Sequence, residues 1–365
     1  MYNHALIIAS RQNADFGAGV MNRRNITLAT AVSLRQTAYE LTPILRKGFL
    51  HKITKYIDRA IGYLSDLKKE DILQIEDIIK KNPDIDAVFV MTSRWGLLAK
   101  RLKKMFPHIK LIFFFHNAEY VYSREEYRLN RTFKNFLYIY YFRHAEKMAL
   151  HDSDFRFVLS RRDDLELKKI APKVNNCILP MSIEDAGKID YKPSTADVLQ
   201  LLFVGSYFFA NVEGLRWFAK NVMPRVNAGL TVVGSGMEAL KDELTAANIQ
   251  VLGRVESLKS YYEAADVVVS PIFSGSGMKT KTAEAMMYGL PVMGTDEAFA
   301  GYDVERGQIG RECNTSREFI EAINFFAENR ELLAGFAQQS RVLFENNYSV
   351  EASLAIVKKC LFSEK

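Results

Sequence analysis

The sequence predicts an α/β protein with two doubly wound parallel-sheet domains. Its 365 residues exceed one ordinary core and fit two domains of roughly 150 residues each. Short apolar runs of strand length recur in both halves, separated by stretches of helical composition. That alternation is typical of parallel sheets covered by helices on both faces. A polar stretch, Asp185 to Asp197, lies between the two sets of strands and is interpreted as the interdomain linker.

Strand candidates in the first half are the runs 5–9, 87–91, 111–115 and 155–159. A turn from Asp15 to Gly19 follows the first of them, and a helix follows the turn. The segment Arg94 to Lys110 has six basic residues and no acidic one. We expect it to form an amphipathic helix packed on the sheet, with its basic face available for lipid. The aromatic stretch Phe136 to Phe142 is interpreted as helix core.

Most strand candidates of the second half end at or just before a glycine, which is typical of a doubly wound fold. These candidates are the runs 201–204, 230–233, 250–252, 267–270 and 291–293. Thr315 and Glu318 have the spacing of a capping box at the start of a helix. A last amphipathic helix is predicted from about Ser349 to Phe362.

Charge is distributed unevenly along the chain. Residues 1–185 carry 31 Lys and Arg against 21 Asp and Glu, whereas the remainder has an excess of acid. A basic first half suggests an anionic partner, such as a membrane surface, a lipid phosphate or a polyanionic glycan. Solvated helix faces explain the same imbalance equally well. Nothing resembles a nucleic-acid-binding module.

The three cysteines, Cys177, Cys313 and Cys360, are far apart and form no CxxC pair. We therefore expect neither a disulfide framework nor a zinc site, and a reducing cytoplasm is the predicted location. The apolar run at residues 5–9 is too short for a signal peptide, and no run reaches the roughly 20 residues of a membrane span.

The densest functional signal is the segment from Ser270 to Thr295. A strand ends at Ser270, and the loop Gly275-Ser276-Gly277 can bring backbone N–H groups close to an anion. A helix is predicted to start near Met278, and its N-terminus carries partial positive charge. The segment therefore predicts a phosphate site.

Charged residues in the first turns of that helix strengthen the prediction. Lys279 and Lys281 each oppose the helix dipole, at a cost of roughly 0.3–1 kcal/mol when exposed. A bound diphosphate would turn that cost into attraction, and Glu284 could accept hydrogen bonds from ribose hydroxyls. The alternative is an ordinary strand–loop–helix unit with surface lysines.

A second glycine pattern indicates a different ligand. Gly234, Gly236 and Ala239 match the dinucleotide fingerprint Gly-x-Gly-x-x-Ala, and Glu256 lies at about the distance of its acidic residue. Taken alone, this pattern would favour a dehydrogenase. It is short and lies in the middle of its domain, so we give it little weight.

The segment 275–292 resembles the donor-binding signature of GT-B-fold glycosyltransferases of family 4. Glu284-Ala285-Met286 and Gly289-Leu290-Pro291-Val292 stand at the characteristic positions. Many members also have a glutamate where this chain has Ser276. The sequence is closer to the subgroup with Gly-x-Gly-x-Lys-x-Lys, in which the loop backbone and the lysines contact the donor.

Other positions resemble the same family in the expected order. The resemblance implies that Gly205 and Ser206 lie near the diphosphate and that Arg254 lies beside the nucleotide base. It implies that Gly19, in the first-strand loop, contacts the diphosphate from the other domain. His116 follows the run 111–115 and would lie near the donor phosphate and the reacting sugar.

The resemblance implies a GT-B architecture with two Rossmann-like domains facing a cleft. We expect an acceptor-binding domain at 1–185, a nucleotide-sugar-binding domain at 198–345, and a C-terminal helix at 346–365 that crosses back to the first domain. His116, Lys279 and Glu284 are the predicted catalytic residues.

The predicted reaction moves a sugar from a UDP- or GDP-linked donor to a glycan or lipid-linked acceptor, with retention, in cell-envelope polysaccharide biosynthesis. No Asp-x-Asp motif ends a strand at the predicted cleft, so we expect no metal and no cofactor beyond the nucleotide-sugar. Peripheral contact with the inner face of the membrane is expected through the basic first domain. The alternative is a non-catalytic GT-B partner subunit that binds glycan or stabilises another transferase.

Overall fold

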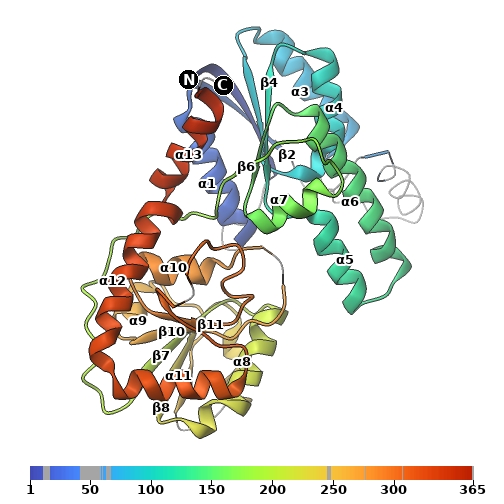
Figure 1. Cartoon of the computed structure of the whole chain (residues 1–365). Coiled ribbons are helices and arrows are strands. Elements are labelled where there is room, and N and C mark those ends of the chain that lie inside the picture. Colours follow the sequence, from blue (N-terminus) through green and yellow to red (C-terminus); the bar gives the residue numbers. More distant parts are fainter. Residues whose placement is uncertain are drawn as a thin grey trace. The chain divides into compact units, whose positions relative to one another are not determined.

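A computed structural model describes residues 1–10, 17–41, 59, 61–62, 67–244, 248–275, 277–305 and 307–363. The chain divides into two compact units (Figure 1). The first unit contains Met1–Pro180 together with Ser353–Lys365, and the second contains Met181–Ala352. Each unit is a parallel sheet flanked by helices, so the predicted α/β class is confirmed. The domain boundaries given above stay a prediction.

The sheet of the first unit has six parallel strands in the order β2-β1-β3-β4-β5-β6. Their bounds are β1 Tyr2–Ser10, β2 Ser33–Leu41, β3 Ala87–Val90, β4 Lys110–Phe115, β5 Phe155–Val158 and β6 Cys177–Ile178. Strand β2 was not predicted, because it is an edge strand with mostly polar, exposed side chains. The chain moves from β1 to one side and then returns to the other side at β3. The strand order therefore reverses between β1 and β3.

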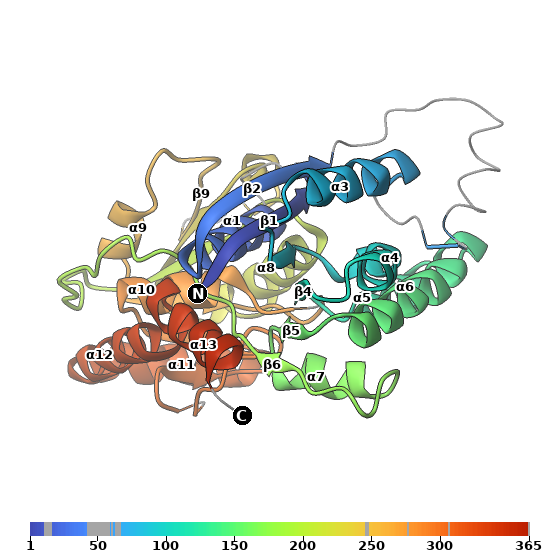
Figure 2. The ribbon, with the colours of Figure 1, turned by 90° about the horizontal axis from the view of Figure 1, so that it is seen from above.

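Helices cover both faces of this sheet. Figure 2 shows α3, α4 and α6 along one side, with α1 and α13 along the other. The helices are α1 Gly17–Ala31, α3 Lys69–Lys81, α4 Gly96–Met105, α5 Glu119–Leu129, α6 Phe133–Asp152, α7 Arg161–Lys168 and α13 Val350–Phe362. The part of α13 from Ser353 onward clusters with this unit.

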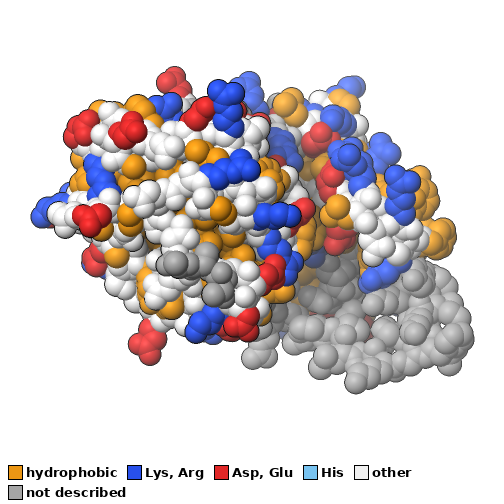
Figure 3. Space-filling view, turned by 90° about the horizontal axis from the view of Figure 1, so that it is seen from below, with side chains coloured by type: hydrophobic (Ala, Val, Ile, Leu, Met, Phe, Trp, Pro, Cys, Tyr) orange, Lys and Arg blue, Asp and Glu red, His pale blue; other side chains and the backbone are white. Residues whose placement is uncertain are grey.

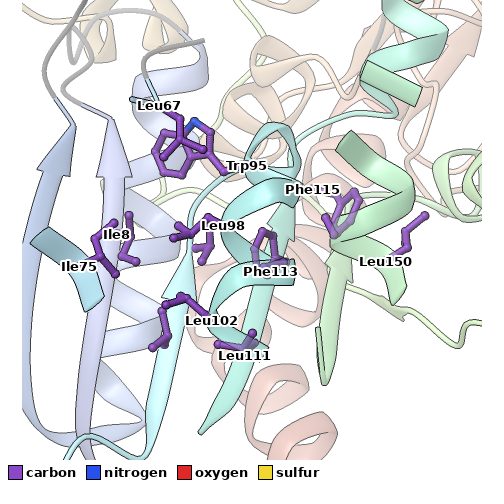
Figure 4. Packing of buried hydrophobic residues seen from close by; sticks show 14 of the residues in the cluster. Ile8, Leu67, Ile75, Trp95, Leu98, Leu102, Leu111, Phe113, Phe115 and Leu150 are labelled. Atoms are coloured by element: carbon purple, nitrogen blue, oxygen red, sulfur yellow. The ribbon is translucent and has the colours of Figure 1, made fainter. Parts of the chain in front are cut away.

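The core of the first unit lies between the strands and α3 and α4. Figure 4 shows Ile8, Leu111 and Phe113 of the sheet beside Leu98 and Leu102 of α4. All are buried. Helix α4 therefore packs through its apolar face, as predicted for the segment 94–110.

The aromatic stretch 136–142 lies in α6, but its interpretation as helix core is wrong. Phe136 is 37% exposed and Tyr140 is 55% exposed, and the buried residues of α6 begin only at Ala145. The contacts of α6 with α4 and with Ser93–Trp95 need only part of the helix surface. The rest of the aromatic side chains stay accessible.

Cys177 and Cys360 form a disulfide between β6 and α13, with 6.6 Å between their Cα atoms. The expectation of no disulfide is therefore wrong. The 183 residues that separate the two cysteines hid a pairing that exists because α13 packs on this unit. Cys313 is buried and free. Because two of the three cysteines are paired, cysteine spacing gives no support for a reducing compartment.

The sheet of the second unit has the order β12-β11-β10-β7-β8-β9, again all parallel. The strands are β7 Leu199–Val204, β8 Ala228–Val233, β9 Ile249–Val251, β10 Val267–Ser270, β11 Val292–Gly294 and β12 Gly310–Glu312. The predicted strands are confirmed, and β12 is added. The strand order reverses between β7 and β10.

Helices of the second unit are α8 Phe209–Asn221, α9 Lys259–Glu263, α10 Thr280–Tyr288, α11 Ser316–Glu328 and α12 Leu333–Leu343. The capping box of α11 is confirmed, because Thr315 Oγ1 accepts from Glu318 N–H and the Glu318 carboxylate accepts from Thr315 N–H at 2.8 Å. Among the described residues, no helix is long and apolar enough to cross a membrane.

Candidate functional site

The second sheet has its strand-order reversal where the sequence predicted a phosphate site. In open α/β sheets, ligands bind beyond the carboxyl ends of the strands at such a point. Gly205 and Ser206 follow β7, and the loop to α10 follows β10. The structure thus places two separately predicted segments on the two strands that flank the reversal.

Backbone packing explains the glycines at the strand ends. A Cβ on Gly234 would lie 1.9 Å from the carbonyl oxygen of Gly205, and a Cβ on Gly253 would lie 2.5 Å from the Glu238 carboxylate. Gly234 N–H donates to the Gly253 carbonyl at 3.2 Å. The backbone that ends β7 therefore leaves no room for a side chain at Gly234.

The surroundings of the next glycine, Gly236, argue against a dinucleotide site at residues 234–239. Gly236 lies against the Tyr207 side chain, and only a four-residue 3-10 helix, Met237–Leu240, follows. The fingerprint needs a longer helix whose N-terminus faces the pyrophosphate. The β8 loop therefore lacks the element that holds a dinucleotide.

Lys281 joins the two loops at the reversal point. The residue is only 6% exposed. Its Nζ donates to Asn211 Oδ1 at 2.7 Å and lies 4.1 Å from the centre of the Phe203 ring. A Cβ on Gly205 would lie 3.0 Å from this Nζ. The amine therefore sits directly against the backbone that ends β7.

Burial dominates the electrostatics of Lys281. It lowers the pKa of this amine to about 7, against the opposing charge of Glu284. Asn211 fixes the geometry, because its Nδ2 donates to the Ser206 carbonyl at 2.8 Å. Asn211 also lies in the first turn of α8, so the N-termini of α8 and α10 both begin after the two flanking strands. Neither helix has a side-chain cap hydrogen bond at its N-cap.

Lys279 has a different environment. It is the N-cap residue of α10, and its Nζ donates to Glu297 Oε1 and to the Gly277 carbonyl, both at 2.8 Å. Its own carbonyl accepts from the Tyr302 hydroxyl at 2.7 Å. The charge of Lys279 is thus already paired, whereas the amine of Lys281 has a neutral amide partner.

Glu284 lies on α10 one turn after Lys281. The Tyr262 hydroxyl donates to its Oε2 at 3.3 Å. Burial raises the pKa of this carboxyl, and the bond from Tyr262 and the charge of Lys281 oppose that shift. Tyr262 is fully buried and stacks on Tyr288 at 4.4 Å. Glu284 is therefore held by a rigid aromatic pair.

The loop before α10 turns at two glycines, because Gly275 and Gly277 have φ angles of 122° and 72°. Ser276 between them lies outside the described residues. Met278 is buried, and its sulfur accepts from the Met181 N–H at 3.3 Å. Its side chain therefore serves packing, which leaves only its backbone for a ligand. Arg254 is exposed and follows β9.

In the first unit, His116 follows β4. Its Nε2 accepts from Asn25 Nδ2 at 2.9 Å. Burial, then the charges of Arg24 and Arg94, lower the pKa of His116 to about 3. The ring is therefore neutral at physiological pH.

The turn predicted from Asp15 to Gly19 is wrong in its second half. Gly17 and Gly19 belong to the first turn of α1, and residues 11–16 lie outside the described residues. Gly19 is buried. Gly19 is in the helix that follows β1, and β1 is one of the two strands that flank the strand-order reversal of the first sheet.

Several polar residues at these strand ends were not predicted. They are Arg24 and Asn25 of α1, Glu146 of α6, Tyr262 and Glu297. Each stands in a segment of ordinary helical or loop composition, so no local motif marks it. In the described part of the chain, no cluster of three His, Cys, Asp or Glu side chains could hold a metal ion.

Comparison with known proteins adds to this geometry. Residues 199–329 match the family described as glycosyl transferases group 1. A Klebsiella pneumoniae protein, described as an uncharacterized 44.6 kDa protein in the cps region, is 24% identical over 253 residues. That alignment covers 64% of this chain and 63% of the relative, which is less than two thirds of the relative's length.

Solved structures agree over nearly the whole chain. HepE from Anabaena, in complex with UDP, superposes with a TM-score of 0.70 at 13% identity, covering 99% of both chains. The lipopolysaccharide outer core galactosyltransferase WaaB gives 0.66 at 14% identity, covering 98% of this chain and 99% of its own. This chain has the GT-B fold. The resemblance to GT-B glycosyltransferases predicted from its donor loop is confirmed.

Proposed function

We propose that this GT-B protein transfers a sugar from a UDP- or GDP-linked donor to a glycan or lipid-linked acceptor. The observation that carries the proposal is the Lys281 amine, buried against Gly205 where the strand order reverses. A lysine desolvated this far, with its pKa near 7, gains most from a nearby phosphate. The UDP bound to HepE supports a nucleotide donor.

The donor would be held by the second unit. Backbone N–H groups of the Gly275–Gly277 loop and of Met278, with Gly205 and Ser206, would surround the diphosphate together with the N-termini of α8 and α10. Lys281 and Lys279 would supply full charges. Glu284 would accept from ribose hydroxyls, and Arg254 would lie beside the base. By resemblance, His116 and Gly19 of the first unit would act near the reacting sugar and the diphosphate.

The proposed reaction needs no covalent enzyme intermediate. The bond between the anomeric carbon and the phosphate oxygen breaks, and a bond to the acceptor hydroxyl oxygen forms on the same face of the sugar. The hydroxyl proton passes to the leaving phosphate. Lys281, Lys279 and the helix N-termini would stabilise the charge on that phosphate, so we propose transfer without a metal ion.

Calorimetry with UDP, GDP and their sugar conjugates tests the proposal. We expect one nucleotide series to bind and Lys281→Met to weaken it, while chelator leaves transfer unchanged. A partner subunit of the alternative type would bind none of these ligands. A strict requirement for a divalent cation would contradict the metal-free scheme.

For the setting, we propose synthesis of a cell-envelope polysaccharide at the cytoplasmic face of a membrane. The relative in the cps region and the likeness to WaaB support this context. Contact with lipid would use the ends of α5 and α6, where Leu129 is 74% and Phe133 75% exposed. Arg128, Arg131 and Lys134 flank them. Figure 3 shows basic and hydrophobic side chains adjoining on the face seen from below.

This surface differs from the segment 94–110 predicted above, whose helix α4 buries its apolar side. Exposed apolar side chains beside cations match an anionic lipid surface. We expect flotation with vesicles containing phosphatidylglycerol and loss of binding in Leu129→Ser/Phe133→Ser. Equal binding by that variant would exclude this surface.

A further inference from the structure

Arg24 of α1 is a buried cation that has no anionic partner in the part of the chain that the structure describes. The residue is 4% exposed. Its Nη2 donates to the Pro180 carbonyl at 3.2 Å and contacts Met21 Sδ at 3.9 Å. Its Nε and Nη1 are buried and have no hydrogen-bond partner among the described residues. Buried guanidinium groups are normally paired and fully hydrogen-bonded.

Other buried polar atoms of α1 and of Arg94 also lack partners within the described residues. The Oδ1 atoms of Asn22 and Asn25 and the Nε of Arg94 are buried without a hydrogen bond. Asn25 contacts His116, and the charges of Arg24 and Arg94 both act on that ring. Arg24, Asn25, Arg94 and His116 therefore form one cluster, here called the Arg24 cluster. It joins α1 to the segments that follow β3 and β4.

Among the described residues, no carboxylate pairs with Arg24. Glu119 pairs with Arg94 Nη2 at 2.8 Å. Glu146 accepts from Ser93 and from the backbone N–H groups that begin α5, and burial raises its pKa to about 8. Glu146 is therefore mostly protonated at pH 7. Since His116 is neutral, no described residue compensates the charge of Arg24.

The cluster lies where the first sheet is expected to bind a ligand. Its strand order reverses between β1 and β3, and the carboxyl ends of these strands lead to α1 and to Arg94. A cation left unpaired at such a point is explained by a counter-ion that arrives with a ligand.

We infer that the Arg24 cluster binds an anionic group, a phosphate or a carboxylate, on the acceptor. The acceptor is assigned because the proposed donor site already supplies the charges of Lys279 and Lys281 to the diphosphate, so this assignment rests on the proposed function. Anion binding itself does not depend on it. A neutral acceptor glycan would leave Arg24 without a counter-ion.

The test uses the full chain with Lys281→Met, which removes one proposed phosphate ligand of the donor site and so weakens binding there. Glucose, glucuronic acid and glucose 1-phosphate are compared by calorimetry. We expect one of the two anionic sugars to bind at least tenfold tighter than glucose. Whichever sugar binds tighter shows whether the cluster prefers a carboxylate or a phosphate. Adding Arg24→Met should abolish the preference, because charge-assisted hydrogen bonds carry roughly 10- to 100-fold in affinity. Equal binding of all three sugars, or a preference that survives Arg24→Met, overturns the inference.

Stability separates a ligand role from a structural one. Arg156 is the matched control, because its guanidinium donates to the carbonyls of residues 150, 153, 154 and 175. We expect Arg156→Met to lower Tm and keep the anion preference. Arg24→Met should keep or raise Tm, since it removes an uncompensated charge. A Tm loss as large as that of Arg156→Met, or failure to fold, would make Arg24 structural and overturn the inference.

Arg24→Lys supplies a second variant that keeps the charge but not the planar donor fork. We expect it to fold and to weaken the anion preference about tenfold. If wild-type protein binds no nucleotide-sugar while the Arg24-dependent preference persists, the proposed function fails and anion binding stands.

Discussion

The two units both place cations at a strand-order reversal, but they treat them differently. In the second unit, Lys279 is paired with the Glu297 carboxylate and Lys281 donates to the neutral Asn211 amide. In the first unit, Arg24 keeps two buried donor atoms without a partner. The two lysine amines of the proposed donor site therefore have hydrogen-bond partners in the free protein, whereas two donor atoms of Arg24 have none among the described residues.

This difference in hydrogen bonding fits two kinds of ligand recognition, one of a group common to many ligands and one that discriminates between ligands. A diphosphate is common to many donors, so a preformed set of N–H groups and lysines serves it with little reorganisation. An incomplete polar cluster discriminates more strongly, because a ligand without the right group leaves buried atoms unpaired. We therefore expect the second unit to supply donor affinity and the first to supply acceptor choice.

The largest effect should come from Lys281. Lys281→Met should weaken UDP- or GDP-sugar binding about 100-fold, since it removes a desolvated charge beside the diphosphate. Lys279→Met should cost only about tenfold, because Glu297 already offsets its charge. Calorimetry measures both, with the exposed Lys259→Met as control. Equal losses at 279 and 281 would contradict the distinction drawn between the two lysines.

His116→Ala should distinguish the proposed roles of the two units, because it should change kcat much more than donor Kd. We expect kcat to fall roughly 100-fold, as for loss of a positioned hydrogen-bonding group, while donor Kd changes less than about threefold. Initial rates and calorimetry give the two values. If donor binding weakened as much as kcat fell, His116 would contribute to donor affinity and not specifically to turnover.

Glu284→Gln should weaken donor binding about tenfold, because a neutral amide accepts less strongly from ribose hydroxyls. Tyr262→Phe should cost only about threefold, since it removes the group that orients the carboxylate. Circular dichroism should show both variants folded. A Tyr262→Phe loss exceeding that of Glu284→Gln would exclude the ribose role.

The pH dependence of donor affinity should reflect Lys281. Its pKa in the free protein is about 7, so the amine is charged below pH 7 and neutral above it. UDP-glucose affinity should fall by up to about tenfold per pH unit above 7, and Lys281→Met should abolish the slope. The free protein should gain stability between pH 7 and 10, because the folded state binds fewer protons there than the unfolded state. A flat affinity profile would contradict the burial argument.

Reduction of the Cys177–Cys360 disulfide should leave donor affinity unchanged, which is the smallest effect. Both cysteines belong to the first unit, so loss of the bond should lower stability by about 2–4 kcal/mol. Thermal unfolding and UDP-glucose calorimetry with and without dithiothreitol measure the two properties. A parallel loss of donor affinity would show that the units are coupled.

Local patterns in the sequence were enough for the fold class and the donor segment. Apolar runs of strand length mark both sheets, and Thr315 with Glu318 marks a helix start, because these signals act between residues close in the chain. The Gly275–Val292 segment was recognised for the same reason. Strand β2 was not predicted from the sequence, because an edge strand needs few apolar residues.

Tertiary structure alone decided which distant side chains meet. Lys281 contacts Asn211 seventy residues away, and this contact separates it from Lys279, which the sequence treats alike. Cys177 pairs with Cys360 only because α13 packs on the first unit. The uncompensated charge of Arg24 depends on the absence of a nearby carboxylate within the described structure. Burial and pairing depend on which residues surround a side chain in the folded protein, and the order of residues along the chain does not specify these neighbours directly.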